Sequence, residues 1–109
     1  MLAKPFRLPA NVRLSNSKLY RTPLFLLKAS SNELPYCRFG FVVGKSTDKR
    51  ATARNRIKRL LRSCVEELLG QFRPGQDLLF FPHRSILEMK REELYNQVHA
   101  FLQDHNFLT

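Results

Sequence analysis

The stretch RFGFVVGKSTDKRATARNRIKRLLR, Arg38 to Arg62, decides the fold because its apolar pattern changes from alternation to helical spacing along its length. Its first part belongs to an alternating segment, residues 36–43, whose apolar side chains take one side: Cys37, Phe39, Phe41 and Val43. The other side carries Arg38, Gly40 and Val42. This pattern predicts a strand with one face against a core and one face open to a ligand.

Residues 51–69 predict an α-helix, because apolar residues recur there at helical spacing: Ala53, Ile57, Leu60, Leu61, Cys64 and Leu68. Gly70 follows as the predicted C-terminal cap. The opposite side of the helix carries polar and basic residues: Asn55, Lys58, Arg59 and Arg62, flanked by Arg54 and Arg56. We therefore expect one face to be buried and the other to present guanidinium groups, which bind phosphate oxygens in a bidentate way.

The segments on either side complete an α+β pattern. Residues 24–28 predict a strand that pairs with residues 36–43 as a hairpin, with Lys28 on the open face. Residues 77–81 predict a short strand buried on both faces, and residues 90–104 predict a closing amphipathic helix. The first 22 residues contain two prolines and predict an irregular arm.

This order of elements predicts a two-layer α/β sandwich, with a sheet covered by helices. A chain of 109 residues with 43% hydrophobic residues supplies one modest core, so we expect a single domain over residues 1–109. Cys37 and Cys64 are too few for a disulfide framework and are expected to be buried free thiols. No apolar run has the length of a membrane span, so we expect a soluble, cytoplasmic protein.

Charge is the main functional signal. The formal net charge is +10, and eight of the 19 basic residues lie between Lys45 and Arg62 beside one acid, Asp48. Such an excess favours a polyanionic partner, either nucleic acid or an anionic membrane. Arginines near a helix start oppose the helix dipole, and a bound phosphate would reverse that cost. A charged helix face is often merely solvated, but ordinary surface helices interleave the two signs.

The sequence gives little support for a metal site, for catalysis by the protein or for binding to a membrane surface. His83, His99 and His105 lack the spacing of metal ligands, so surface or capping roles are expected. No nucleophile elbow or phosphate-binding loop is present, and no carboxylate pair indicates a protein nuclease. The basic helix also lacks the bulky aromatic face that membrane-surface helices favour.

The stretch Arg38 to Arg62 strongly resembles the protein component of bacterial ribonuclease P. The hallmark is an Arg-Asn-Arg helix after a strand that ends in V-[SG]-K, here Arg54-Asn55-Arg56 with Lys58-Arg59. A Pro-Gly turn, a D-L-L-F-F strand and a terminal helix then follow in the family's order, so the resemblance covers residues 23–108.

The resemblance implies an accessory subunit that binds a large catalytic RNA and helps it to cleave the 5′ leader from precursor tRNA. Hydrolysis would be carried out by RNA and Mg²⁺, with no cofactor held by the protein, which would be a monomer in a 1:1 complex. It also implies a mainly antiparallel sheet of about four strands with a left-handed β-α-β crossover. The residues expected to face the RNA subunit are Lys45, Lys49, Arg50, Arg54, Asn55, Arg56, Lys58, Arg59 and Arg62.

The family's second site is a cleft on the open face of the sheet that holds the single-stranded leader, and here Lys28, Arg38 and Gly40 could line it. Two features depart from the family pattern. Residues 9–20 are too short and lack the phenylalanines of the usual N-terminal helix, and Ser46 stands where a second basic residue is common. The alternative function is a ribosomal or general RNA-chaperone domain that uses the same arginines without a role in cleavage.

Overall fold

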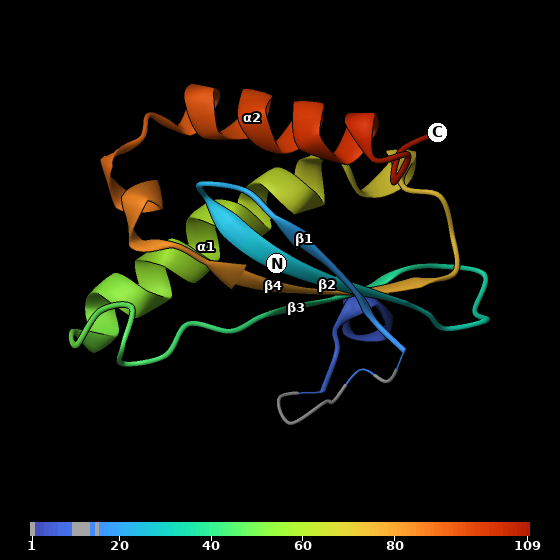
Figure 1. Ribbon diagram of the computed structural model, residues 1–109, viewed down its shortest axis with the longest axis horizontal. Helices are drawn as coiled ribbons and strands as arrows, with labels where there is room; N and C mark the ends of the chain where they lie inside the picture. The colour runs from blue at the N-terminus through green and yellow to red at the C-terminus, as the bar shows by residue number, and fades with distance from the viewer. Residues whose placement is uncertain (1, 10–13, 15) are drawn as a thin grey trace.

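The computed structural model describes residues 2–9, 14 and 16–109. The strands of this part are β1 (Lys18–Arg21), β2 (Phe25–Ser31), β3 (Arg38–Phe41) and β4 (Gln76–Pro82). The α-helices are α1 (Ala51–Glu67) and α2 (Arg91–Asp104), and the short 3-10 turns are η1 (Lys4–Phe6), η2 (Leu69–Gln71) and η3 (Arg84–Glu88). Figure 1 shows how these elements are arranged.

The strands form one mixed sheet in the order β1-β2-β4-β3. β2 is antiparallel to both β1 and β4, and β3 is parallel to β4. Leu19, Lys28, Leu79 and Gly40 are successive partners in the register, so they form one row on one face of the sheet. The predicted α+β class and the four strands are confirmed.

The predicted hairpin between residues 24–28 and 36–43 is wrong, because β4 lies between β2 and β3. β4 buries Leu78 and Phe80 on one face and Leu79 on the other. A strand that is apolar on both faces is best placed at the centre of a sheet, which explains its insertion between two strands that precede it in the chain.

The expectation of an irregular arm over residues 1–22 is wrong for Lys18–Arg21, which pairs with β2. Thr22 stabilises the turn between the two strands, because its Oγ1 accepts a hydrogen bond from the N–H of Leu24 at 3.0 Å. Tyr20 is half-buried while the rest of β1 is exposed. Four residues with a single inward side chain give too short an alternation to recognise in the sequence.

Both helices pack against the same face of the sheet, and Figure 1 shows α2 above it. The core therefore lies between sheet and helices, as expected for a two-layer fold. Its largest fully buried side chains come from both layers: Phe25, Leu27, Phe39, Phe80, Ile57, Leu61, Leu94 and Leu102. Cys37 and Cys64 are buried free thiols, as predicted.

The two predicted helices are confirmed, with a different end for α1. Its C-cap is Leu68, which is fully buried, and Gly70 lies in η2 without a left-handed backbone. Packing of Leu68, and not a glycine cap, therefore fixes where the helix stops. α1 connects the parallel neighbours β3 and β4, and the hand of this crossover stays a prediction.

The N-terminal segment, residues 2–9, lies along the outer edge of β3. The N–H of Leu8 donates to the carbonyl of Phe39 at 2.8 Å, and Arg7 forms an isolated parallel bridge with Phe39. Leu8 covers Gly40, where an added Cβ would lie 3.3 Å from Leu8 and 2.7 Å from Cδ1 of Leu79. Figure 1 shows η1 below the sheet, on the side opposite α2.

Candidate nucleic-acid interface

The basic face of α1 is where the periodicity of the sequence places it. Ile57, Leu61 and Cys64 are fully buried, while Arg56 and Arg59 are exposed on the other side. One shallow hollow of about 410 Å³ on this side is lined by four residues: Asn55, Lys58, Arg59 and Arg62. The structure therefore brings together the central residues of the predicted RNA-binding set.

Several of these cations have no counter-charge among the residues that the structure describes. Within the described part of the chain, no carboxylate lies within ion-pair distance of Arg56, Lys58 or Arg59. Arg62 places its guanidinium 5.8 Å from the ring centroid of Phe41, a cation–π contact, and it forms no ion pair with a described carboxylate. The middle of α1 thus presents positive charge to solvent and is matched to an anionic partner.

The start of α1 uses its arginines differently. Arg50 is the N-cap residue and provides no side-chain cap to the helix, and the first turn contains no acid. Arg54 turns back and donates from Nη1 to the carbonyl oxygens of Asp48 at 3.0 Å and Lys49 at 2.8 Å. These bonds hold the loop that leads into the helix.

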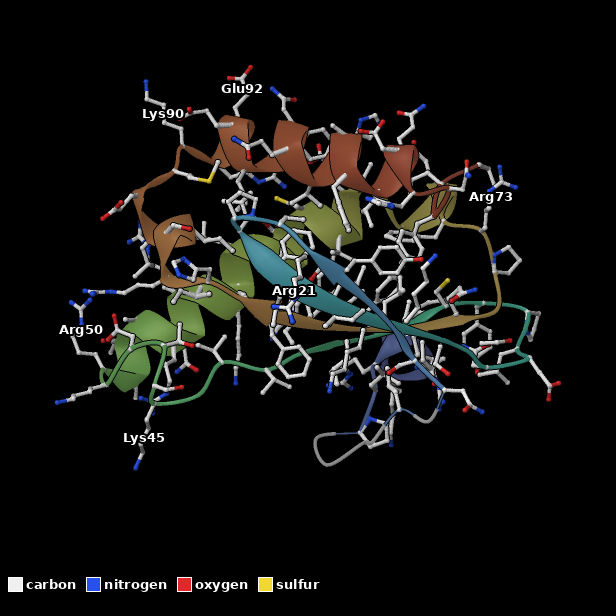
Figure 2. The ribbon with its side chains drawn as sticks, viewed as in Figure 1. Arg21, Lys45, Arg50, Arg73, Lys90 and Glu92 are labelled. Atoms are coloured by element: carbon white, nitrogen blue, oxygen red, sulfur yellow. The ribbon has the colours of Figure 1, made fainter. Side chains whose placement is uncertain are left out.

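Asp48 adds a second internal contact at this end. It is buried and accepts hydrogen bonds from the backbone N–H of Arg50 at 2.9 Å and from the Arg50 side chain at 3.1 Å. The side-chain bond from Arg50, then the backbone bond, hold the pKa of Asp48 well below its ordinary value although burial raises it. Lys45 and Lys49 are exposed, and Figure 2 shows Lys45 and Arg50 at the same end of the molecule.

The three residues predicted for a leader cleft all lie on the open face of the sheet, but they differ in exposure and in their contacts. Lys28 is exposed, and its Nζ lies 5.4 Å from the ring centroid of Phe81. Gly40 is covered by Leu8. Arg38 is held by a bidentate ion pair, with 2.9 Å from Nε and 2.8 Å from Nη2 to the carboxylate of Asp77.

Asp77 is the buried acid of that pair. It also accepts a hydrogen bond from Nδ2 of Asn32 at 2.8 Å. Burial raises the pKa of Asp77, but the hydrogen bonds from Arg38 and Asn32 and the charge of Arg38 outweigh it and lower the pKa below the ordinary value. Arg38 therefore fixes β3 to β4 and keeps part of its guanidinium at the surface.

Sequence reasoning missed an apolar hollow on the same open face. Leu26, Val42 and Phe81 line it together with residues of the loop after β3, and its volume is about 440 Å³. Val42, directly after β3, is 42% exposed and is one of two large apolar side chains with such exposure among the described residues. The apolar run within residues 77–81 predicts burial on both faces, so the sequence gives no sign that Phe81 lies at this surface.

One of the histidines, His83, has a structural contact. His83 accepts a hydrogen bond at Nδ1 from the N–H of Ser85 and caps η3, which is one of the two roles predicted for it. Across residues 2–9, 14 and 16–109, no three His, Cys, Asp or Glu side chains are grouped as metal ligands. Neither α1 nor α2 is long and apolar enough to cross a bilayer, nor is any other helix in the described residues.

Comparison with known proteins points to one family. The Ribonuclease P family matches residues 11–106 of the chain. A ribonuclease P protein component of Marinomonas sp. is 34% identical over 101 residues, which cover 83% of this chain and 76% of that protein. A ribonuclease P protein component of Geobacillus kaustophilus is 40% identical over 62 residues, covering 57% of this chain and half (50%) of that protein's length.

Solved structures share the fold. The RNase P protein of Staphylococcus aureus superposes with a TM-score of 0.76 at 18% identity, covering 95% of this chain and 98% of the other. The RNase P protein of Thermotoga maritima gives a TM-score of 0.73 at 22% identity, covering 82% and 84%. The sequence match, the shared fold and the one-sided basic helix with its Arg-Asn-Arg motif agree: this chain belongs to the ribonuclease P protein component family.

Proposed function

We propose that this chain binds the catalytic RNA of ribonuclease P and the 5′ leader of precursor tRNA, and assists endonucleolytic removal of the leader. Processing of the tRNA 5′ end is the known role of the family to which the chain belongs. In this proposal the RNA subunit and its Mg²⁺ ions carry out the hydrolysis, and one protein binds one RNA. The protein contributes charge, shape and position.

The observation that carries the proposal is the uncompensated charge along the middle of α1. Arg56, Lys58 and Arg59 have no carboxylate partner among the described residues, and the helix beneath them is fixed by fully buried side chains. Because the backbone of the helix is already fixed, only these side chains have to be ordered when they meet phosphates. Fork-shaped guanidinium groups also match the geometry of phosphate oxygens.

Binding of the leader is supported by the open face of the sheet. Phe81 and Val42 offer apolar surface beside the charged Lys28, and unpaired bases bind to surfaces of this kind by stacking while cations contact the backbone. Gly40 and Arg38 contribute less in this proposal, because Leu8 covers the first and Asp77 holds the second. The leader would then lie over the part of the open face formed by Lys28, Phe81 and Val42.

Reconstitution of precursor-tRNA processing tests the proposal. The cognate RNA subunit is incubated with a precursor tRNA at low Mg²⁺ concentration, with and without the protein. We expect the protein to accelerate release of the 5′ leader under conditions where the RNA alone is slow. Binding to RNA without any acceleration would contradict this role and favour a general RNA-chaperone domain. Cleavage of the precursor tRNA by the protein alone would contradict the proposal that the RNA subunit carries out the hydrolysis.

A second substrate separates the two sites. A precursor tRNA with a leader shortened to one nucleotide keeps the contacts of the RNA subunit but loses those of the open face. We expect substitution of Phe81 by Ala to weaken binding of the long-leader substrate and to leave the short-leader substrate unchanged. An equal effect on both substrates would show that Phe81 does not contact the leader.

A further inference from the structure

Asp48 joins two arginines that lie far apart in the sequence. It is the only acid between Lys45 and Arg62, and it precedes the first turn of α1. Its carboxylate contacts Arg50 at the helix start and Arg84, the first residue of η3. Arg84 was not among the residues that the sequence pointed to, because nothing in its own surroundings resembles the Arg-Asn-Arg helix.

The two arginines meet at the same atom. Nη2 of Arg50 lies 3.1 Å from Oδ2 of Asp48, and Nε of Arg84 lies 3.2 Å from that same oxygen. Arg50 also donates from Nε to Oδ1 at 3.1 Å, so it uses the fork of its guanidinium. The nearest approach of Arg84 to this carboxylate is through Nε, and no other carboxylate in the described chain forms an ion pair with Arg84.

The acid and the two arginines of this cluster differ in exposure. The side chain of Asp48 is 5% exposed, whereas those of Arg50 and Arg84 are both 64% exposed. The carboxylate therefore lies beneath the two guanidinium groups, which reach into solvent above it. Figure 2 shows Arg50 at the start of α1 next to the η3 turn.

The backbone around this cluster is fixed on both sides. Arg54 holds the loop that carries Asp48, as described above. η3 is capped by His83, and Ile86 of the same turn is fully buried next to α1. Both arginines thus start from ordered backbone, which lowers the entropy cost of holding them together.

The charges of the cluster do not cancel. One carboxylate faces two guanidinium groups that are both mostly exposed, so a net positive charge remains on the solvent side. Without Asp48, two like charges would repel and separate. With Asp48 they stay close enough to bind one further anion between them, and a phosphate group suits the geometry of paired guanidiniums.

We propose that Arg84 belongs to the RNA-binding surface, and that Asp48 is a positioning residue that holds Arg50 and Arg84 as a pair for one phosphate group of the ribonuclease P RNA. This inference rests on the proposed function. It extends the basic surface of α1 around the start of the helix onto η3.

The substitution Asp48→Asn is a test because two explanations predict opposite changes in RNA affinity. It keeps the size of the side chain and removes one negative charge from a protein that binds a polyanion. Attraction by net charge alone predicts tighter RNA binding. Positioning predicts weaker binding, by about fivefold, because Arg50 and Arg84 are no longer held together. The matched control is Asp104→Asn at the exposed end of α2, which changes the charge equally and is expected to leave binding unchanged or slightly tighter.

Removal of Arg84 tests the contact itself. We expect Arg84→Ala to weaken binding of the RNA subunit by about fivefold and to make the log-log salt dependence shallower by about 0.7 to 1, the value of one phosphate contact. The charge-matched control is Arg73→Ala, which Figure 2 shows at the opposite end of the molecule from Arg50. Thermal unfolding of each variant identifies those that remain folded, and a loss of stability alone would not change the salt dependence of the folded protein.

The outcomes separate this inference from the proposed function. If the wild-type protein binds the RNA and Arg59→Ala weakens binding, but Arg84→Ala and Asp48→Asn match their controls, the inference is wrong and the proposed function stands. If the wild-type protein does not bind the RNA, the proposed function fails first. Weaker binding by Asp48→Asn and Arg84→Ala, with no further loss in the double variant, supports the inference because the two residues then act as one unit.

Discussion

At the start of α1, Arg50 and Arg54 are bonded within the chain, whereas Arg56 and Arg59 further along the same helix contact no carboxylate among the described residues. The two regions have the same residue type, but only the arginines at the helix start have contacts within the described chain that hold them in place. At the helix start no side-chain cap is present, so arginine stabilises the entering loop through its carbonyl groups and Asp48. In the middle of the helix, packing by leucine and isoleucine stabilises the structure, which leaves the arginines for a partner. Residue type alone therefore does not tell which cations are held within the chain and which are left for a partner.

The largest effect is expected beneath the basic face. Leu61→Ala removes a fully buried side chain from the core side of α1 and should lower the free energy of unfolding by about 2–5 kcal/mol. At temperatures where the variant stays folded, RNA affinity should be close to that of wild type. Urea unfolding followed by circular dichroism measures the first quantity and a filter-binding titration the second. A small stability loss would contradict the facing of the helix.

Arg59→Ala should have the reverse effect of Leu61→Ala: it should lower RNA affinity and leave stability unchanged. Arg59 is exposed and unpaired by any described carboxylate, so its removal should leave the unfolding midpoint unchanged while RNA affinity falls by about 5- to 10-fold. The same two measurements apply. Unchanged affinity would mean that the middle of α1 is only a solvated face.

Arg54→Ala should affect both properties. Loss of its hydrogen bonds to the carbonyls of Asp48 and Lys49 should cost about 1 kcal/mol of stability, and the looser loop should weaken RNA binding by a few fold. Arg56→Ala is the matched control, since Arg56 has no such bonds and should change affinity only. If both variants left stability unchanged, the distinction between the two regions of the helix would be lost.

The smallest effect concerns acid stability at the sheet. The folded state lowers the pKa of Asp77, so this carboxylate stabilises the fold above its unfolded pKa, about 3.9, and that contribution is lost as pH falls through the folded value. Arg38→Ala removes a main cause of the lowered pKa. We expect the stability of this variant to depend less on pH than that of wild type below about pH 4. Parallel curves of unfolding free energy against pH for the two proteins would contradict the role of the pair.

The parts of the structure that follow local rules could be predicted from the sequence. Helical spacing of Ile57 and Leu61 placed the buried face of α1, and the opposite position of Arg59 followed from it. The alternation of residues 36–43 likewise separated Phe39, which is buried, from the open face of the sheet. The spacing of apolar and charged residues is a property of neighbouring positions in the chain, so these features could be predicted without knowing the tertiary structure.

Other features depend on contacts between distant segments. The position of β4 between β2 and β3 was missed because strand order is decided by the whole sheet and not by proximity in the chain. The cover of Leu8 over Gly40 and the contact of Arg84 with Asp48 join segments with no shared pattern. The sequence also could not distinguish Arg54, which is bonded within the chain, from Arg56, which has no ion pair with a described residue, because both belong to the same motif.

The salt dependence of binding to the ribonuclease P RNA tests the central claim most directly, because it counts phosphate contacts without depending on their sequence context. With about six phosphates engaged, the logarithm of the binding constant should fall with the logarithm of salt concentration at a slope of about −4 to −5. The Arg56→Ala, Arg59→Ala double variant should be shallower by about 1 to 2. A wild-type slope close to zero would contradict the claim that the basic face of α1 binds the RNA backbone.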